Sequence, residues 1–472
     1  MKNLSAIVLA AGKGTRMKSS HPKLVHEICG VPMIYYPLKV LGELGCKNTV
    51  CLTGHGSEAV REAVSMLPLK KQPAFTLQRE QLGTGHAVKI AFKALKGAGT
   101  GDVLILSGDV PLIKKDTLKK FITAHRRKKD TALSFITVDI GDGKGYGRVI
   151  RDSRGELISI TEDKDLLPTQ RHIGEINSGI YIAKAQFLKK YLPKIKNKNA
   201  QKEYYLTDLV SLALRDKLNV QTFLHGDPYE LRGINDRLDL SMVEELLRDE
   251  IREKHMRSGV TMIDPFNTYI ESLVKIGSDV VLEPNTYIEG TSVIGTDCRI
   301  EAGVKITDSV IGSGSHIKSG SIIESSVIKK DVTIGPLARL RPESVIDDGA
   351  RIGNFVEIKK SKIGKGSKAG HLSYIGDSII GKNVNIGAGV ITCNYDGVKK
   401  YITIIEDNVF VGSDSQLVAP IRIGKGSYIG SGSTITKDVP AEALSLTRGE
   451  QRTIKDWAKL RLKAKKVKKR NK

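Results

Sequence analysis

The chain of 472 residues is longer than a single hydrophobic core allows, which is about 250–300 residues, so two or three domains are expected. It has no run of about 18 uninterrupted apolar residues, and its short N-terminal apolar run leads straight into a glycine loop, which argues against a membrane span and a signal peptide. The formal net charge of +23 favours anionic ligands, and the five scattered cysteines lack the paired spacing of a zinc site, which favours a reducing cytoplasm.

The first half of the chain, up to about Phe223, alternates short apolar runs with amphipathic segments. Strands are predicted from β-branched content at residues 6–10, 49–53, 74–77, 103–107, 132–138 and 178–183. This alternation predicts an α/β domain, residues 1–235, whose mostly parallel, Rossmann-like sheet is covered by helices on both faces. Residues 236–258 are expected to form a linker helix, because apolar residues such as Leu238 and Met242 fall near helical spacing among many charges.

A glycine loop follows the first predicted strand. It spans residues 11–17, and His21, Pro22 and Lys23 come soon after it. Glycines directly after a strand let backbone N–H groups approach phosphate oxygens, and Arg16 and Lys23 can offset phosphate charge. The loop matches neither the dinucleotide fingerprint nor the Walker loop. By itself it is equally compatible with an ordinary strand-to-helix turn.

Three further segments strengthen the case for a phosphate site. They are Gln78 with residues 81–86, residues 106–112, and residues 233–237. Asp109 lies just past the C-terminal end of an apolar strand, where ligands bind in open α/β sheets, and its carboxylate can hold a hard cation such as Mg²⁺. The alternative is an aspartate that only caps a turn.

With these segments the domain resembles the sugar-phosphate nucleotidyltransferases, in particular the N-acetylglucosamine-1-phosphate uridylyltransferases. The resemblance implies in-line attack of a sugar 1-phosphate on the α-phosphorus of UTP, with Arg16 and Lys23 offsetting charge and Asp109 and Asn235 binding Mg²⁺. Ser107 stands where some relatives carry an aromatic residue. The implied UTP and UDP-sugar positions are Leu9, Ala10, Ala11, Gly12, Lys23, Gln78, Gly83, Thr84, Ser107, Gly108, Asp109, Gly147, Glu162, Asn177 and Asn235.

From Ile276 onward the sequence repeats every six residues. One aliphatic residue per hexad, with glycine next to many of them, predicts triangular coils of roughly 18 residues that stack as a parallel β-helix over residues 259–451. Steps of five, such as Ile306 to Ile311, are expected to be turn adjustments. The inward positions include Ile276, Leu282, Ile288, Ile294, Ile300, Ile306, Ile311, Ile317, Ile323, Ile328, Ile334, Leu340, Ile346, Ile352 and Ile358, and after a disruption at residues 394–401 also Ile405, Val411, Leu417, Ile423, Ile429 and Ile435.

Polar motifs gather on neighbouring predicted coils, at residues 339–342, 357–360, 370–374 and 385–389, and in the disruption of the register. Binding and catalytic residues often lie in a loop that interrupts a regular coil. His371 lies two residues beyond the inward Ala369, so we expect it to be exposed near a corner. A neutral imidazole can take a proton from an attacking amine, and a nearby carboxylate such as Glu357 can orient it. The alternatives are a surface histidine and a coil that serves only as scaffold.

These motifs closely resemble the acetyltransferase half of the bacterial bifunctional family that makes UDP-N-acetylglucosamine. The resemblance covers nearly the whole chain and implies a left-handed coil, a homotrimer with the site between adjacent β-helices, and direct transfer from acetyl-CoA, so Cys393 needs no nucleophilic role. His371 is implied as the general base for the amino group of glucosamine 1-phosphate. The implied sugar-phosphate positions are Arg341, Lys359, Tyr374 and Asn385, and the implied acetyl-CoA or neighbouring substrate positions are Ala388, Asn394, Tyr395, Ser413, Ser431 and Arg448.

The last segment, residues 452–472, is strongly basic. It holds eleven Lys or Arg residues against the single Asp456. A solvated end is expected there, and contact with RNA or anionic lipid is the alternative. Two rival interpretations of the whole chain remain open at this point: a single-activity nucleotidyltransferase with a structural β-helix, and an assembly scaffold that binds nucleic acid through its tail.

Overall fold

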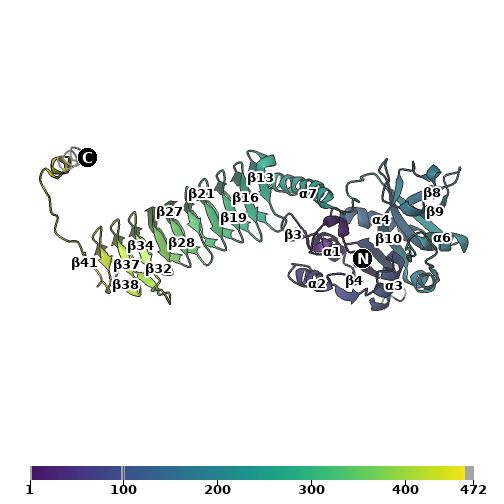
Figure 1. Cartoon of the computed structure of the whole chain (residues 1–472), viewed down its shortest axis with the longest axis horizontal. Coiled ribbons are helices and arrows are strands. Elements are labelled where there is room, and N and C mark those ends of the chain that lie inside the picture. Colours follow the sequence, from purple (N-terminus) through teal and green to yellow (C-terminus); the bar gives the residue numbers. More distant parts are fainter. Residues whose placement is uncertain (1–2, 97–98, 100, 463–472) are drawn as a thin grey trace, which may run out of the picture. The chain divides into compact units, whose positions relative to one another are not determined.

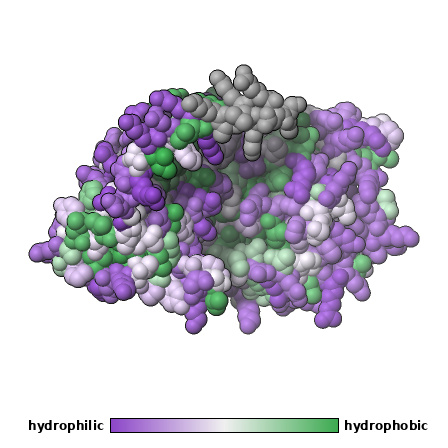
Figure 2. Space-filling model, turned by 60° about the vertical axis from the view of Figure 1, so that its left-hand side comes forward, coloured by the Kyte–Doolittle hydropathy of each residue, from purple (hydrophilic) through white to green (hydrophobic). Residues whose placement is uncertain are grey.

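The computed structural model describes residues 3–96, 99 and 101–462. The chain divides into two compact units, Met1–Ile251 and Arg252–Lys472, which we call the front unit and the back unit. The division falls inside helix α7 (Arg237–Arg257). None of the helices in the described residues is long and apolar enough to cross a membrane. The face seen in Figure 2 is mostly hydrophilic, with small apolar patches between charged side chains.

A mixed sheet forms the centre of the front unit, with its main strands in the order β11-β7-β10-β6-β1-β4-β5 (Figure 1). The strands are β1 (Leu4–Ala10), β4 (Asn48–Thr53), β5 (Ala74–Leu77), β6 (Asp102–Ser107), β7 (Thr131–Asp139), β10 (Glu175–Lys184) and β11 (Asn219–His225). Pairing is parallel except along β10, which runs antiparallel to both β6 and β7. The chain reaches β10 through the hairpin of β8 (Arg148–Arg151) and β9 (Leu157–Thr161) rather than through a crossover helix, which explains the reversal.

Helices cover both faces of this sheet. The helices α3 (Thr84–Ala94), α5 (Ala185–Tyr191) and α6 (Asp208–Arg215) supply alanine, valine and leucine side chains to one buried cluster with Ile7 and Ile105 of the central strands. On the other face, α1 (Tyr35–Glu43) contacts β1, and α4 (Lys115–Arg127) contacts β7. A further helix, α2 (Ser57–Ser65), follows β4. The α/β layering expected from the sequence is therefore present, with strands β8, β9 and β11 in addition.

Three parallel sheets form the back unit, one along each side of a stack of coils (Figure 1). They run from β12 (Thr261–Met262) to β41 (Leu444–Ser445), from β13 (Thr268–Ile270) to β40 (Thr434–Ile435), and from β14 (Lys275–Ile276) to β38 (Ile421–Ile423). Strands of two to four residues pair with the next coil along each sheet, so that Ile300 lies beside Ile317 and Ile317 beside Ile334. From Leu282 to Ile435 the predicted inward positions are buried, with at most 4% of any residue exposed, whereas Ile276, the first predicted inward position, is only half-buried because it lies in the first coil of the stack.

Each five-residue step of the repeat contains a left-handed residue. The steps after Ile306, Ile323, Ile358 and Ile375 each contain one non-glycine residue with a positive φ of 41–47°, namely Asp308, Ser325, Lys360 and Asp377. Six-residue steps also contain left-handed residues, such as Asn285, Asp297 and Asp331 with φ of 57–59°, so this conformation belongs to the turns of the coil in general. Asp and Ser tolerate this conformation because their short side chains bond to nearby backbone.

Candidate active sites

The front site is built where β1 and β6 end. Gly14, with φ of +62°, follows β1, and a Cβ added there would lie 2.7 Å from the Cβ of Lys23. The missing side chain therefore lets Lys23 approach the loop closely. The Lys23 ammonium forms an ion pair with Asp109 and donates to the Ile234 carbonyl at 3.0 Å. Both charged side chains are largely buried, at 14% and 19% exposure, so this contact is shielded from water.

Asp109 and the loop of residues 233–235 are held against each other. The Ile234 N–H donates to the Asp109 carbonyl at 3.0 Å, and the Ser107 hydroxyl donates to the Asp109 carboxylate at 2.5 Å. On the far side of the loop, Arg16 Nη2 donates to Asn235 Oδ1 at 2.8 Å. The structure thus brings together the carboxylate, the amide oxygen and the two cations that the sequence singled out from four separate segments.

A cavity of about 300 Å³ opens beside Asp109 and Lys23, and we call it the nucleotide cavity. Gln81 Nε2 donates to the Ala11 carbonyl at 2.6 Å, which ties the far wall of the cavity to the glycine loop. A Cβ added at Gly12 would meet nothing within 4 Å, so the backbone there faces open space. The predicted nucleotide positions that line this cavity are Leu9, Ala10, Ala11, Gly12, Lys23, Gln78, Gly83, Thr84, Ser107 and Asp109. Gly108 lies under them, where a Cβ would be 2.9 Å from a Leu24 methyl group.

Three of the predicted UDP-sugar positions, Gly147, Glu162 and Asn177, form a second group just before β8, just after β9 and within β10. The Asn177 N–H donates to the Gly147 carbonyl at 2.8 Å, and a Cβ on Gly147 would lie 3.4 Å from the Glu162 carboxylate. Burial raises the pKa of Glu162, and a hydrogen bond from Thr207 at 3.0 Å only partly opposes this shift. None of the three residues lines the nucleotide cavity. A neighbouring cavity of about 480 Å³ is lined by Arg16, Tyr146 and Asn235.

His371 ends strand β30 (Lys368–His371), which pairs with β27 (Arg351–Asn354) so that His371 lies beside Asn354. The imidazole is exposed, and its Nδ1 lies 2.7 Å from Asn354 Oδ1. Because an amide oxygen only accepts, Nδ1 carries the proton, and Nε2 of the neutral ring keeps its lone pair. Glu357, on β28 (Glu357–Lys359), instead accepts from Arg341 Nη1 at 3.0 Å. The partner of His371 within one chain is therefore Asn354, which sequence reasoning missed.

Cations gather one coil further, around the loop that disrupts the register. Lys359 lies 3.5 Å from Asp377, and Asn394 donates to the same carboxylate. Lys400, which was not among the predicted residues, lies beside Lys359, and the hydrogen bond and charge of that ammonium lower the pKa of Lys400. The position of Lys400 inside the disrupted segment was a signal from which it could have been predicted. The Tyr374 hydroxyl and the Asn394 amide meet over Gly376, where an added Cβ would lie 2.6 and 2.8 Å from them.

The remaining predicted positions follow the stack from coil to coil. Asn385 begins β33 (Asn385–Ile386), which pairs with the strand that carries His371. The Ala388 carbonyl accepts from Asp414 N at 2.7 Å, and the Ser413 carbonyl accepts from Gly432 N at 2.8 Å, so Ala388, Ser413 and Ser431 occupy successive coils. A Cβ on Gly430 would lie 3.5 Å from an Arg448 guanidinium nitrogen. Tyr395 is exposed in the disrupted loop, and burial raises the pKa of the Cys393 thiol.

Comparison with known proteins gives family matches for both units. Residues 5–229 match the nucleotidyl transferase family, residues 266–345 and 327–419 match the GMPPB C-terminal domain, and residues 402–437 match the bacterial transferase hexapeptide family of six repeats. The chain is 48% identical to the bifunctional protein GlmU of Geotalea uraniireducens, over 97% of this chain and 99% of that relative. It is 46% identical to that of Clostridioides difficile, over 96% of this chain and 97% of that relative. The chain belongs to the GlmU family.

Membership of the GlmU family confirms the resemblance drawn from the sequence motifs, together with the fold: a nucleotidyltransferase unit followed by a left-handed β-helix of hexapeptide repeats. The chain is accordingly a bifunctional transferase of UDP-N-acetylglucosamine synthesis, with an acetyltransferase and a uridylyltransferase activity. The interpretations as a single-activity enzyme or as a pure scaffold are thereby set aside. The roles of individual residues stay predictions.

Proposed function

We propose that the two activities reside in the two clusters described above, one in each unit, and that they act in sequence. The back unit transfers the acetyl group of acetyl-CoA to glucosamine 1-phosphate. The front unit then joins the resulting N-acetylglucosamine 1-phosphate to the uridylyl group of UTP and releases pyrophosphate. We further propose residues 1–235 as the uridylyltransferase domain, 236–258 as the linker helix and 259–451 as the acetyltransferase domain, in a cytoplasmic protein.

In the back unit, the free lone pair of His371 Nε2 supports a role as general base. The 2-amino nitrogen of the sugar attacks the thioester carbonyl carbon, Nε2 takes the proton, and the carbon–sulfur bond breaks to release coenzyme A. The hydrogen bond from Nδ1 to Asn354 holds the ring in the tautomer that this step needs. Arg341, Lys359 and Tyr374, with Asn385, are proposed to bind the sugar phosphate, because they present positive charge and polar groups on adjacent coils.

The proposed acetyl-CoA residues continue along the same stack. Ala388, Ser413 and Ser431 lie on successive coils, which gives an extended ligand a row of backbone and hydroxyl groups. Asn394, Tyr395 and Arg448 are proposed to contribute from the disrupted loop and from beyond the last coils. The exposed position of His371 supports a homotrimer in which a neighbouring β-helix completes the site, with Glu357 available from that side for substrate or imidazole.

In the front unit, a phosphate oxygen of the sugar 1-phosphate attacks the α-phosphorus of UTP, and the bond to the β-phosphate breaks. Lys23 and Arg16 offset the charge of the reacting phosphates, and the buried position of Lys23 strengthens its effect. Gln78, Gly83 and Thr84 are proposed to hold the uracil nucleotide in the nucleotide cavity, which all three line. Gly147, Glu162 and Asn177 are proposed to hold the sugar.

The donor set at Asp109 and Asn235 fits a magnesium ion. Both offer hard oxygen ligands, and within the described part of the chain no group of three His, Cys, Asp or Glu side chains competes as a metal site. Mg²⁺ commonly binds through one or two protein oxygens and takes its other ligands from phosphates and water. Asp109 and Asn235 would hold the ion, which would supply positive charge to offset that of the UTP phosphates beside Lys23 and Arg16.

Substitution of one residue in each unit tests this assignment. His371→Ala is expected to abolish acetyl transfer and to leave uridylyl transfer unchanged, whereas Lys23→Ala is expected to lower uridylyl transfer by about 100-fold and to leave acetyl transfer unchanged. His316→Ala, a histidine on an outer position of the same coil stack, is the matched control. Product masses give the acetyl rate from glucosamine 1-phosphate with acetyl-CoA and, in a separate reaction, the uridylyl rate from N-acetylglucosamine 1-phosphate with UTP and Mg²⁺. Retention of acetyl transfer by His371→Ala contradicts the proposal.

A further inference from the structure

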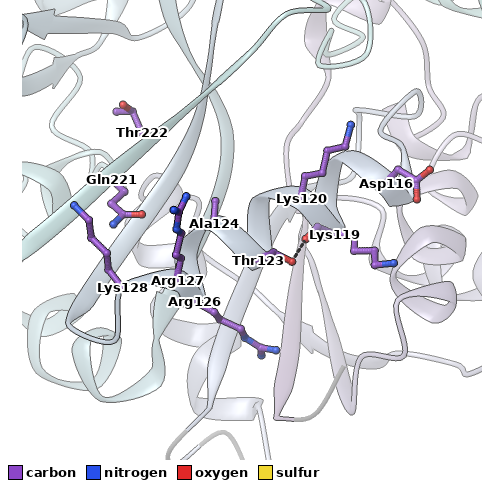
Figure 3. Close-up of a pocket in the computed structure, with 10 residues that line it drawn as sticks. All are labelled: Asp116, Lys119, Lys120, Thr123, Ala124, Arg126, Arg127, Lys128, Gln221 and Thr222. Atoms are coloured by element: carbon purple, nitrogen blue, oxygen red, sulfur yellow. Dashed lines mark hydrogen bonds between the residues drawn. The ribbon is translucent and has the colours of Figure 1, made fainter.

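A basic groove lies in the front unit apart from the proposed uridylyl site. It has a volume of about 1270 Å³ and is lined by helix α4 with the residue after it and by β11, the edge strand of the sheet (Figure 3). We call it the α4 groove. None of its residues lines either cavity of the uridylyl site. The residues of the groove are Asp116, Lys119, Lys120, Thr123, Ala124, Arg126, Arg127, Lys128, Gln221 and Thr222.

The helix presents its cations to the groove because of their spacing. Lys119, Lys120, Thr123 and Arg127 recur at intervals of three, four, seven and eight residues, so they share one face of α4. The opposite face carries the apolar side chains that pack on the sheet, including Leu118, which is fully buried. Figure 3 shows Lys119 and Lys120 along the middle of α4, and Arg127, Lys128 and Gln221 at its end.

Four of these cations have no acidic partner. In the described part of the chain, Lys119, Lys120, Arg127 and Lys128 form no ion pair, and all four are exposed. Arg126 differs, because it points away in Figure 3 and donates to the buried Asp102 at 2.7 Å. Cations at a helix C-terminus stabilise the helix dipole, which accounts for Arg127 and Lys128. The same effect does not reach Lys119 and Lys120 in the middle of the helix, because it falls off within the last turn.

The chemistry of the groove selects an anion rich in acceptors. Lys and Arg side chains are donors only, and the amide of Gln221 can donate as well, whereas the Thr123 hydroxyl already donates to the Lys119 carbonyl at 2.8 Å. Phosphate oxygens accept several such bonds at once. Among the ten described lining residues none is aromatic, so a nucleobase would find no ring to stack on. A ligand made of phosphate groups alone is therefore the best match.

The separation of the cations sets the length of the ligand. Lys119 and Arg127 are eight residues apart, which at 1.5 Å rise per residue is about 12 Å along the helix axis. A single phosphate cannot contact both ends of such a row, whereas a chain of phosphates can. We propose that the α4 groove binds a linear oligophosphate, an anion with several linked phosphate groups.

Calorimetric titration of the full-length protein with linear inorganic polyphosphate tests this proposal. UDP-N-acetylglucosamine is added first at saturation, so that the phosphate subsites of the front site are occupied. The variants Lys119→Gln/Lys120→Gln and Arg127→Gln/Lys128→Gln are each expected to weaken binding at least about tenfold. Lys189→Gln/Lys198→Gln removes the same charge from exposed lysines of the same unit and is expected to leave the affinity unchanged. Orthophosphate at equal phosphate concentration is expected not to bind.

Three results overturn the proposal. Equal weakening in the control variant means that binding follows net charge rather than the groove. Unchanged binding in both groove variants assigns the polyphosphate to another basic segment, since the tail of residues 452–472 is intact in every protein tested. Tighter binding of a short RNA duplex than of polyphosphate, lost in the same variants, makes the groove a nucleic-acid surface instead.

Discussion

Asp239, in the first turn of α7, holds the loop that carries Asn235. Its carboxylate accepts from Asn235 N at 3.0 Å and from Arg232 Nη2 at 2.9 Å, so it sets the position of the proposed metal ligand. Asp239→Ala leaves both donors without their partner and is expected to lower uridylyl transfer by about tenfold to 100-fold, because hydrogen bonds to a charged group contribute about 1.5–3 kcal/mol. The Mg²⁺ concentration needed for half the maximal rate is expected to rise as well.

A merely structural role for Asp239 would leave that magnesium requirement unchanged. Titration of the uridylyl rate with Mg²⁺ separates the two cases, and acetyl transfer by the same variant reports on global damage. Glu253→Ala on the same helix is the matched control, because that carboxylate makes only an exposed pair with Arg257.

Asp102 makes the folding stability of the front unit depend on pH. Burial by itself raises the pKa of this carboxyl, but hydrogen bonds from Lys184 and Arg126, with the His125 ring 3.7 Å away, outweigh burial and hold the pKa well below its ordinary value of 3.8. As the pH falls, Asp102 is therefore protonated in the unfolded chain before it is protonated in the folded chain. The stabilisation is complete above about pH 4 and is lost progressively below it.

Asp102→Asn is expected to cost about 2 kcal/mol of unfolding free energy at pH 7, since Lys184 and Arg126 lose their partner but remain partly exposed to water. The difference from the original protein is expected to shrink below pH 4. Denaturant titrations at several pH values, followed through the helical circular dichroism signal, measure it. A difference that stays constant with pH would show that the charge of Asp102 is not what stabilises the unit.

The exposure of His371 could be predicted from the sequence, whereas its hydrogen-bond partner was missed. The exposure of His371 followed from its place two residues beyond an inward position. Its partner also had a signal: because a five-residue step shortens the coil, Asn354 falls directly beside His371 on the same sheet. Glu357 comes later in its coil and falls on the next strand, β28. The contact between Asp239 and Asn235 also had a local signal, because Asp236 and Asp239 have the spacing of a helix N-terminal cap, and the Asp236 carboxylate accepts from Asp239 N at 2.9 Å.

Among helices and strands, those whose side chains are regularly buried were predicted correctly from the sequence, and half-exposed strands were missed. The six-residue pattern could be recognised because every hexad must place one aliphatic side chain inside, and the expected positions from Leu282 onward are buried. Strands β8 and β9 were missed because half-exposed and charged residues such as Arg151 interrupt their apolar pattern. Strand β11 lies at the edge of the sheet, where alternation is weak.

A second repeat within the coils was also missed. Buried serines stand at one corner of successive coils: the Ser292 hydroxyl accepts from Ser309 N at 3.2 Å, and the Ser309 hydroxyl accepts from Ser326 N at 3.1 Å. The Ser309 hydroxyl also donates to the Thr307 carbonyl at 2.8 Å. Each serine thus satisfies a backbone N–H that the corner removes from the regular strand ladder.

Ser309→Ala removes the acceptor of a buried N–H and is expected to destabilise the coil locally by about 1–3 kcal/mol. Because each coil contacts only its neighbours, the effect is expected to stay near residues 309–326. Hydrogen exchange of the peptide containing Ser326 is expected to speed up by about tenfold or more. Ser319→Ala, at a half-exposed serine of the same region, serves as control. Faster exchange spread evenly over the whole coil stack contradicts this local role.

The residues proposed for the two activities lie in separate parts of the chain. Every residue proposed for uridylyl transfer lies at or before Asp239, inside the front unit, and every residue proposed for acetyl transfer lies at or after Arg341, inside the back unit. Each unit has its own core: the strand and helix cluster of the front unit, and the aliphatic ladder of the back unit. Compact units with separate cores are expected to fold independently.

A fragment of residues 1–251 is therefore expected to keep uridylyl transfer at a rate close to that of the full chain and to show no acetyl transfer. It retains the part of α7 that begins at Arg237, so Asp239 can still hold the loop of Asn235. A fragment of residues 1–230 lacks that loop and is expected to lose uridylyl transfer even where circular dichroism shows a folded sheet. Rates for both fragments, measured beside the full chain, decide the point. A folded but inactive fragment 1–251 would mean that the front chemistry depends on residues beyond its own unit.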